Sequence, residues 1–307
     1  MAVVSETTGL FATGTGGRLR DLEIPTRVLV MGMAHHDGRV LAEEVYPVAE
    51  ACGQTADQVR SCLRRLTNEG LFTRTGEGRE AVFTATPAGL RALGASLERT
   101  RLAYAQDAAG KGWDRRWRLV AFAIPESKRT ARDAFRDHLI ELGGASIQNG
   151  LYVSPHRWGA DAVAEAQRLG VAHHVTLAST DDLDIGSTRD PREIAARLWP
   201  LDELAHRYQR FSDLYAGIPD ALEEMRKEHR RLSEAEFLPG ALIIGIKFAE
   251  CFNVDPLLPP ELLPRPWPGR TARDLLVRSR RLGVLLREQH NKPQLFAPFD
   301  DVIERIS

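Results

Sequence analysis

Hydrophobic and polar residues between positions 25 and 104 follow helical spacing in four segments and alternate in a fifth. Pro25 opens the first helical segment, and Gly53 ends the second, LAEEVYPVAEACG. A third helical segment follows at 55–69, and the runs LFTRT and AVFTAT then alternate around GEGRE, which is typical of a hairpin. Thr86 caps and Pro87 begins the fourth helix. Three helices, a two-stranded wing and a closing helix together predict a winged helix-turn-helix.

The third helical segment has one apolar face and one basic face. Thr55 and Gln58 have the T-x-x-Q spacing of a capping box. Apolar positions at i, i+3, i+4 and i+7 predict a buried face made of Val59, Cys62, Leu63 and Leu66. A helix in the major groove presents its polar side chains to bases, and arginine pairs with guanine or phosphate. The predicted DNA-binding residues are Thr55, Gln58, Arg60, Ser61, Arg64 and Arg65, with Arg74 and Arg79 on or beside the wing.

The overall charge gives this interface no support. The chain has 41 basic residues, 36 of them Arg, against 42 acidic ones, and its net charge is −1. DNA binding must therefore depend on a local patch, which a dimer would double. The alternative, that these arginines form an ordinary solvated helix face, stays open, although the order of helix, helix and wing favours DNA.

The middle of the chain predicts a second α+β unit. Strand, helix and extended segments follow one another from WRLVAFAIP to AHHVTLAST, and Asn149 with Gly150 can form a two-residue hairpin turn. The predicted order is β-α-β-β-α-β, that of a ferredoxin-like domain. After the polar stretch DDLDIGSTRDPRE the pattern is mainly helical, interrupted by a proline-rich connector, NVDPLLPPELLPRPWPGR.

The predicted fold class is therefore α+β, in three domains. They are preceded by a flexible Gly- and Thr-rich tail at 1–20. The domains are a winged helix-turn-helix at 21–108, a ferredoxin-like domain for dimerisation or as a scaffold at 113–182, and a helical domain at 190–307 with a possible effector site.

Composition places the protein in the cytoplasm. Three cysteines without C-x-x-C spacing argue against a disulfide scaffold and against a zinc site, so no metal or cofactor is predicted. The N-terminus lacks the charged and apolar regions of a secretory signal. The longest apolar run, ALIIGI, is far shorter than the roughly 20 residues of a membrane span.

The stretch WDRRWR combines Trp113 and Trp117 with Arg115, Arg116 and Arg118. In a ligand site these arginines would bind phosphates and the tryptophans would stack on an aromatic ring. In the alternative, structural interpretation the same residues begin a strand and support the junction between domains. We retain these five residues as candidates for effector binding.

The whole chain from about residue 21 to 300 resembles the PaaX family of bacterial transcriptional repressors, which control the catabolism of phenylacetic acid and related aromatic compounds. The resemblance depends on VRSCLRRLTNEGLF, on WRLVAFAIPESKRTARDAFRDHLIELGGASIQNGLYVSP, on LWPLDELAHRYQRF and on DPLLPPELLPRPWPGRTARDLL. It implies a homodimeric repressor that binds a partly palindromic double-stranded DNA operator. It also implies release by an aromatic acyl-CoA such as phenylacetyl-CoA.

The middle segment also resembles the small ferredoxin-like endonucleases of the CRISPR adaptation machinery. Those enzymes hold a metal with an aspartate in a tyrosine-aspartate-isoleucine context, where this chain has Phe122, Ala123 and Ile124. Alanine offers no oxygen ligand to a hard cation. A metal-dependent nuclease is therefore the disfavoured alternative, an effector-independent DNA-binding protein is a third, and we expect no enzymatic activity.

Overall fold

The computed structural model describes residues 25–288 and 295–306, so the predicted tail at 1–20 lies outside the described residues. The fold mixes helices with two antiparallel sheets, which confirms the α+β class. The chain forms two compact units: unit 1 comprises residues 1–104, 208–251 and 268–307, and unit 2 comprises 105–207 and 252–267. These units cut across the three sequential domains of the sequence prediction, because the helical third part contributes to both.

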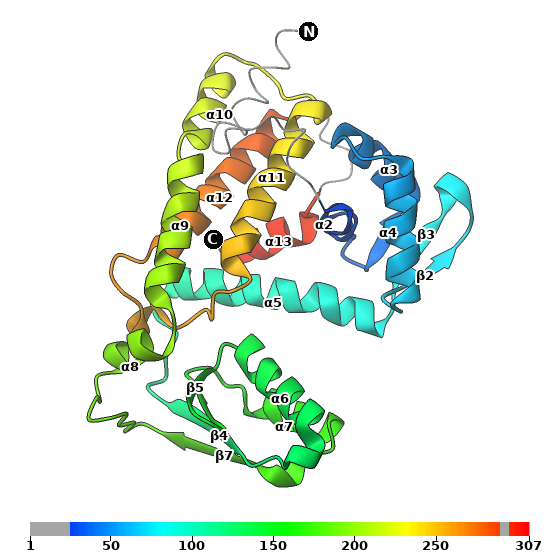
Figure 1. Ribbon diagram of the computed structural model, residues 1–307. Coiled ribbons are helices and arrows are strands. Elements are labelled where there is room, and N and C mark those ends of the chain that lie inside the picture. Colours follow the sequence, from blue (N-terminus) through cyan, green and yellow to red (C-terminus); the bar gives the residue numbers. More distant parts are fainter. Residues whose placement is uncertain (1–24, 289–294, 307) are drawn as a thin grey trace. The chain divides into compact units, whose positions relative to one another are not determined.

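The N-terminal part of unit 1 contains the predicted helices and hairpin (Figure 1). Helix α2 spans Thr26–Gly32, α3 spans Ala42–Ala51 and α4 spans Ala56–Asn68. Strands β2 (Phe72–Thr75) and β3 (Val82–Ala85) form the antiparallel hairpin, with Thr73 opposite Thr84. Their core consists of buried side chains from all three helices and the hairpin, among them Leu29, Val45, Val59, Leu63 and Phe83.

The predicted two-stranded hairpin is part of a sheet of three strands, and the sequence did not predict the third. Strand β1 (Arg39–Leu41) pairs antiparallel with β3, so that the order is β1-β3-β2. Three residues are too few for period-two alternation to show in the sequence. Beyond the sheet, Thr86 Oγ1 accepts a hydrogen bond from the Gly89 amide at 3.2 Å and starts the long helix α5 (Pro87–Ala109), as the sequence predicts.

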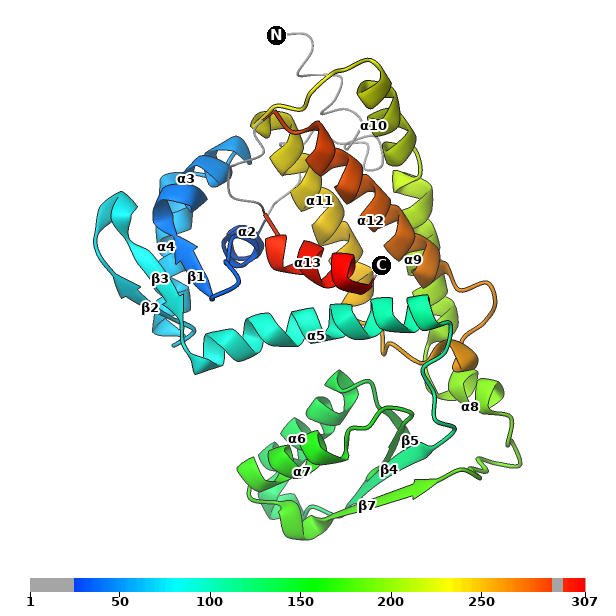
Figure 2. The same ribbon diagram turned by 180° about the vertical axis from the view of Figure 1, so that it is seen from behind.

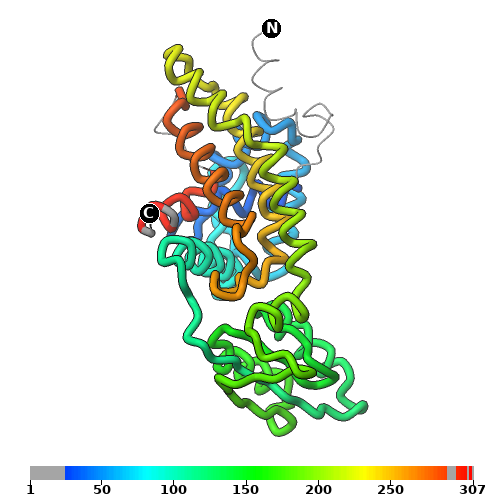
Figure 3. Tube along the Cα trace, turned by 90° about the vertical axis from the view of Figure 1, so that its left-hand side faces the viewer, coloured from blue at the N-terminus to red at the C-terminus, as the bar shows by residue number. Residues whose placement is uncertain are grey.

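The helical part of unit 1 contains α10 (Ile218–Lys227), α11 (Glu234–Phe252), α12 (Pro268–Leu286) and α13 (Ala297–Ile306), together with the end of α9 (Leu201–Tyr215). Figure 3 shows α11 and α12 running alongside each other, and Arg287 after α12 forms an ion pair with Glu234 of α11 at 2.8 Å. Figure 2 shows α13 beside α2. The Phe296 amide donates to the Gly32 carbonyl at 2.7 Å, so α2 and the segment before α13 are directly connected.

Unit 2 has a four-stranded antiparallel sheet in the order β5-β6-β4-β7. Its elements follow one another as the sequence predicts: β4 (Trp117–Phe122), α6 (Arg129–Glu141), β5 (Ala145–Gln148), β6 (Leu151–Ser154), α7 (Gly159–Arg168) and β7 (Val175–Thr180). Asn149 and Gly150 connect β5 to β6. Among the described residues, no helix is long and apolar enough to cross a membrane.

Neighbouring residues of each central strand enter cores on opposite sides of this sheet, because side chains alternate along a strand. Val120 and Tyr152 pack with Phe135 of α6 and with Trp158 just before α7. Trp117 and Val153 pack on the other side with residues of α8 (Pro191–Leu198) and of the proline-rich segment. Before Pro268, where α12 begins, that segment is irregular apart from a 3-10 turn at Pro260–Leu262.

Candidate nucleic-acid interface

The start of α4 is determined by the predicted capping box. Thr55 Oγ1 accepts a hydrogen bond from the Gln58 amide at 3.2 Å, and Gln58 Oε1 accepts from the Thr55 amide at 2.7 Å. Two otherwise unsatisfied amides of the first turn are thereby bonded, which stabilises the helix by about 1 kcal/mol. Thr55 and Gln58 therefore act first as the structural start of α4, and the amide nitrogen of the exposed Gln58 side chain stays available for a base or phosphate.

The two faces of α4 divide as the sequence predicts. Val59, Cys62, Leu63 and Leu66 are at most 5% exposed, and α4 packs on α2 and α3. All four predicted DNA-binding residues on the helix body are exposed: Arg60, Ser61, Arg64 and Arg65. A buried apolar face with an exposed basic face is the arrangement that a groove-binding helix requires.

The arginines of this face differ in their partners. Arg60 donates to Asp57 one turn earlier, and this hydrogen bond raises the pKa of the Arg60 guanidinium. The side chains of Asp57 and Arg60 are 84% and 63% exposed, so the ion pair is held in water and adds little to the stability of the fold. Within the described residues, Arg64 and Arg65 form no ion pair. They are the side chains of α4 most readily available to phosphates or bases.

Two further candidates lie on the hairpin of β2 and β3, which contacts α4 through β2. Arg74 lies on β2, and Arg79 lies in the short 3-10 turn Gly78–Glu80 between the strands. Both are exposed. Figure 1 shows the hairpin and α4 next to each other. The wing arginines and the α4 arginines therefore belong to neighbouring elements of one unit.

The stretch WDRRWR begins β4 in unit 2, and the structure favours the structural interpretation for two of its residues. Trp117 is 2% exposed and its ring stacks on Trp199, with centroids 6.3 Å apart. Arg118 donates to the Pro155 carbonyl at 2.8 Å and to Asp114, and its hydrogen bond is the main cause that lowers the pKa of Asp114 to about 2.

The other three residues of the stretch differ in exposure. Trp113 is half-buried and donates through Nε1 to the Arg116 carbonyl at 3.2 Å, whereas Arg115 and Arg116 are exposed. Trp117 and Arg118 are thus occupied by packing and by internal hydrogen bonds. That leaves Trp113, Arg115 and Arg116 as the predicted effector residues whose side chains can still reach a ligand.

The position expected to carry a nuclease metal ligand is Ala123, just after β4. Its amide donates to the His174 carbonyl at 3.0 Å, and its methyl group offers no ligand. In the described part of the chain, no three His, Cys, Asp or Glu side chains gather as metal ligands. The adjacent histidines His35 and His36 have single acidic partners: His35 pairs with Glu44 at 2.6 Å, and His36 pairs with Asp301 at 3.1 Å.

Comparison with known proteins gives matches over most of the chain. A family model of the PaaX protein central Cas2-like domain matches residues 110–195, and one of the PaaX-like protein C-terminal domain matches residues 199–290. The Transcriptional repressor PaaX of Escherichia coli (strain K12) is 27% identical over 245 residues, which cover 80% of this chain and 74% of the relative. The chain belongs to the PaaX family.

A solved structure shares the fold of this PaaX family member. The uncharacterized protein Rv0674 from Mycobacterium tuberculosis superimposes with a TM-score of 0.54 at 18% sequence identity. The match covers 87% of this chain and 98% of that one. The E. coli relative is named a repressor rather than an enzyme.

Proposed function

We propose that this PaaX family member is a transcriptional repressor that binds a double-stranded DNA operator through α4 and the wing. The observation that carries the proposal is the exposed basic face of α4, which the capping box and the buried face of the helix orient away from the core. In this interpretation residues 21–108 form a winged helix-turn-helix, with α3 and α4 as its two-helix motif and β2–β3 as its wing. Arg60, Ser61, Arg64 and Arg65 contact bases or phosphates, and Arg74 and Arg79 contact the backbone beside the groove.

Substitution of the α4 arginines tests this assignment. R64A and R60A should each weaken operator binding by about 1–3 kcal/mol if the arginine contacts a base. If it contacts a phosphate, the slope of log affinity against log salt should fall by about one unit. The matched control is R129A, because Arg129 is an exposed arginine of α6 in unit 2 with 70% of its side chain accessible. If R60A and R64A bind the operator as tightly as R129A at every salt concentration, α4 is not the DNA-binding helix.

A homodimer is part of the same proposal. One winged helix on a chain of net charge −1 binds DNA weakly, whereas two copies engage two half-sites. Recognition helices of such dimers lie about 34 Å apart, one helical turn of DNA, or a multiple of it. The ferredoxin-like domain at 113–182 is the proposed dimerisation or scaffold domain. Light scattering should give twice the chain mass of 34.2 kDa, and footprinting should protect an inverted repeat.

The proposed signal for release is an aromatic acyl-CoA, with phenylacetyl-CoA as the first compound to test. Its support is membership of the PaaX family. Gel shifts of the operator complex with phenylacetyl-CoA, phenylacetate and acetyl-CoA test the release. Loss of the complex with phenylacetyl-CoA alone would support the proposal, and an unchanged complex with all three would reject this class of effector.

A further inference from the structure

Helix α12 has a second, solvent-facing stripe besides its core face. Ala272, Ser279, Gly283 and Leu286 are buried, and Gly283 lies against the ring of Phe237 in α11. A second set at positions i, i+3, i+4, i+7 and i+8 occupies a different side of the helix, and its members share one pocket: Asp274, Val277, Arg278, Arg281 and Leu282. Helical spacing alone places these five side chains in one row.

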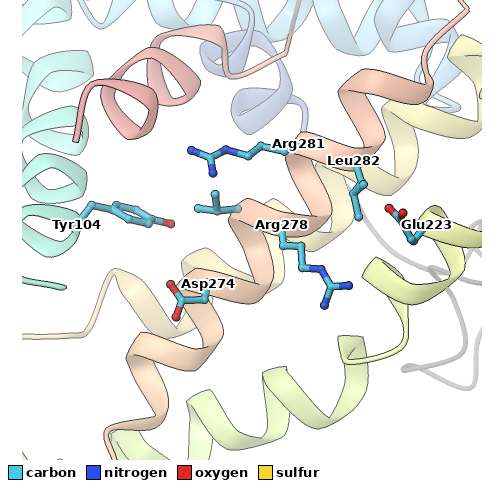
Figure 4. Close-up of a pocket in the computed structure, with 7 residues that line it drawn as sticks. Tyr104, Glu223, Asp274, Arg278, Arg281 and Leu282 are labelled. Atoms are coloured by element: carbon cyan, nitrogen blue, oxygen red, sulfur yellow. The ribbon is translucent and has the colours of Figure 1, made fainter. Parts of the chain in front are cut away.

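The pocket has a volume of about 380 Å³ and lies within unit 1. Tyr104 of α5 and Glu223 of α10 complete its lining. Figure 4 shows Arg281 and Tyr104 extending into the space between α12 and α5, with Glu223 on the side of α10. Ligand pockets for small molecules commonly enclose about 300–1,000 Å³, so this pocket is of the size for a small organic molecule or for one part of a larger one.

The charges of the lining are unequally available. Glu223 is paired with Arg226 at 2.6 Å, and this hydrogen bond is the main cause that lowers the pKa of Glu223. Asp274 also has an interaction partner, so it is not a free negative charge in the pocket. Arg278 contacts Asp220 at 3.2 Å, but these side chains are 59% and 79% exposed, so an anionic ligand can replace that partner at little cost. Within the described residues, Arg281 forms no ion pair.

The remaining lining is apolar or aromatic. Tyr104 is 9% exposed, and Val277 and Leu282 are half-buried. Guanidinium groups bind carboxylates and phosphates through two parallel hydrogen bonds, while an aromatic and aliphatic wall favours an apolar body. The lining thus combines two available cations with an apolar and aromatic wall. Figure 4 shows Arg281 on the side of Tyr104 and Arg278 extending away from it along α12.

We propose that this pocket binds an organic anion with an aromatic or branched apolar body, whose charged end pairs with Arg281 beside Tyr104, with Arg278 as the second cation of the lining. The proposal rests on the proposed ligand response of the repressor and places its ligand in unit 1, whereas Trp113, Arg115 and Arg116 belong to unit 2. In a free acid the charged end is the carboxylate next to the apolar body. In a CoA thioester the phosphates lie a pantetheine arm away from the acyl group, so a pocket of this size holds only one of these two parts, and the probes below distinguish the sources.

The pocket is connected by contacts to the helices of the DNA-binding part. Tyr104 belongs to α5, which follows strand β3 of the wing directly. On another side of α12, Arg280 donates to Asp300 of α13 at 2.9 Å. The Phe296 amide before α13 donates to Gly32 of α2 at 2.7 Å. A ligand that changes the spacing of α5 and α12 therefore acts on both ends of the winged helix.

Calorimetry with the full chain tests the site, with phenylacetate, phenylacetyl-CoA and CoA as probes. At least one of the two phenyl-bearing probes should bind, and the double variant R278Q/R281Q should weaken that binding about tenfold or more, because each lost charge-assisted bond contributes to affinity. R270Q is the matched control, since Arg270 is an exposed arginine of the same helix outside the pocket, and its affinity should stay within about twofold of the parent. Circular dichroism of each variant checks that the fold is retained.

Three results would overturn the site: no binding of either phenyl-bearing probe, parental affinity in R278Q/R281Q, or binding of CoA equal to that of phenylacetyl-CoA. Binding of phenylacetate alone would support the pocket and identify the carboxylate as the charged end, but it would reject an acyl-CoA effector. Binding of phenylacetyl-CoA without release of the operator would support the pocket and reject the proposed switch. The pocket and the proposed function can thus fail separately.

Discussion

The substitution G89A adds one methyl group where the start of α5 packs against the end of the hairpin, and so tests that contact directly. A Cβ atom at this position would lie 2.0 Å from the Leu71 carbonyl oxygen and 3.2 Å from Ala85 Cβ. The first neighbour is backbone, so a rotamer change cannot relieve the clash. Leu71 O also accepts the Thr86 amide at 2.9 Å, so the first turn of α5 would have to move away from the end of α4 and the start of β2.

The expected sign is opposite to that of an ordinary glycine in a helix. Replacing Gly by Ala in a helix usually stabilises a protein by about 0.5–1 kcal/mol. For G89A the overpacking should outweigh this gain and lower the free energy of unfolding by about 1–3 kcal/mol. Gly94 lies on the same helix, and a Cβ atom added there would have open space within 4 Å, so G94A should be stabilising by about 0.5–1 kcal/mol.

Urea denaturation followed by circular dichroism measures both variants. All five tryptophans lie in unit 2, so tryptophan emission recorded in the same titration reports that unit as an internal reference. G89A should also weaken operator binding, because the wing and α4 meet at Leu71. A G89A protein as stable as the parent, or a G94A protein destabilised as much as G89A, would refute the steric argument.

The remaining predictions concern two exposed ion pairs. D57N should tighten binding to duplexes without an operator by roughly fivefold, because it removes a negative charge from the face of α4 and frees Arg60; unchanged affinity in fluorescence anisotropy would contradict a DNA-facing Asp57. The lowered pKa of Asp114 means that its pair with Arg118 stabilises unit 2 above pH 4, and that this contribution is lost as the pH falls from about 4 to about 2. Because Asp114 is 35% exposed, D114N should lower the free energy of unfolding by only about 1 kcal/mol at pH 7. The stability of the variant, followed by tryptophan emission, should also depend less on pH below pH 4. An equal pH dependence in parent and variant would count against the pair.

Local patterns of the sequence predicted most of what carries the proposed DNA interface. The capping box of Thr55 and Gln58 and the four apolar positions of α4 are spaced within a few turns, so their signal needs no tertiary information. Pro87 and the cap of Thr86 likewise determine where α5 begins. Strand β1 escaped prediction because its three residues exist as a strand only through pairing with β3.

Features made by distant segments could not be predicted in this way. Tyr104 and Arg281 lie 177 positions apart in sequence, and only the fold brings them to one pocket. Trp117 stacks on Trp199 for the same reason, so the sequence could not tell a ligand-binding tryptophan from a core tryptophan. The stripe of α12 does leave a signal in the sequence, a second row of residues at i, i+3, i+4 and i+7. Without knowledge of a facing helix, however, helical periodicity assigns such a polar row to solvent.

The proposed release makes an energetic demand on the chain of contacts that links α12 to α2. A ligand shifts an equilibrium only through the difference between its affinities for the two states, and a change from 99% bound to 99% free requires about 5.5 kcal/mol. The contacts of the two arginines and of the apolar wall supply that difference in affinity only if most of these contacts form in the DNA-free state and not in the DNA-bound state. The part-buried pair of Arg280 and Asp300, 13% and 18% exposed, links α12 to α13, so we expect the two helices to move together. The Phe296 amide donates to the Gly32 carbonyl at 2.7 Å, which links the segment before α13 to the end of α2. We therefore expect a displacement of α12 that makes or breaks the pocket to reach α2 through these contacts, and to reach α4 through the packing of α2 on α4.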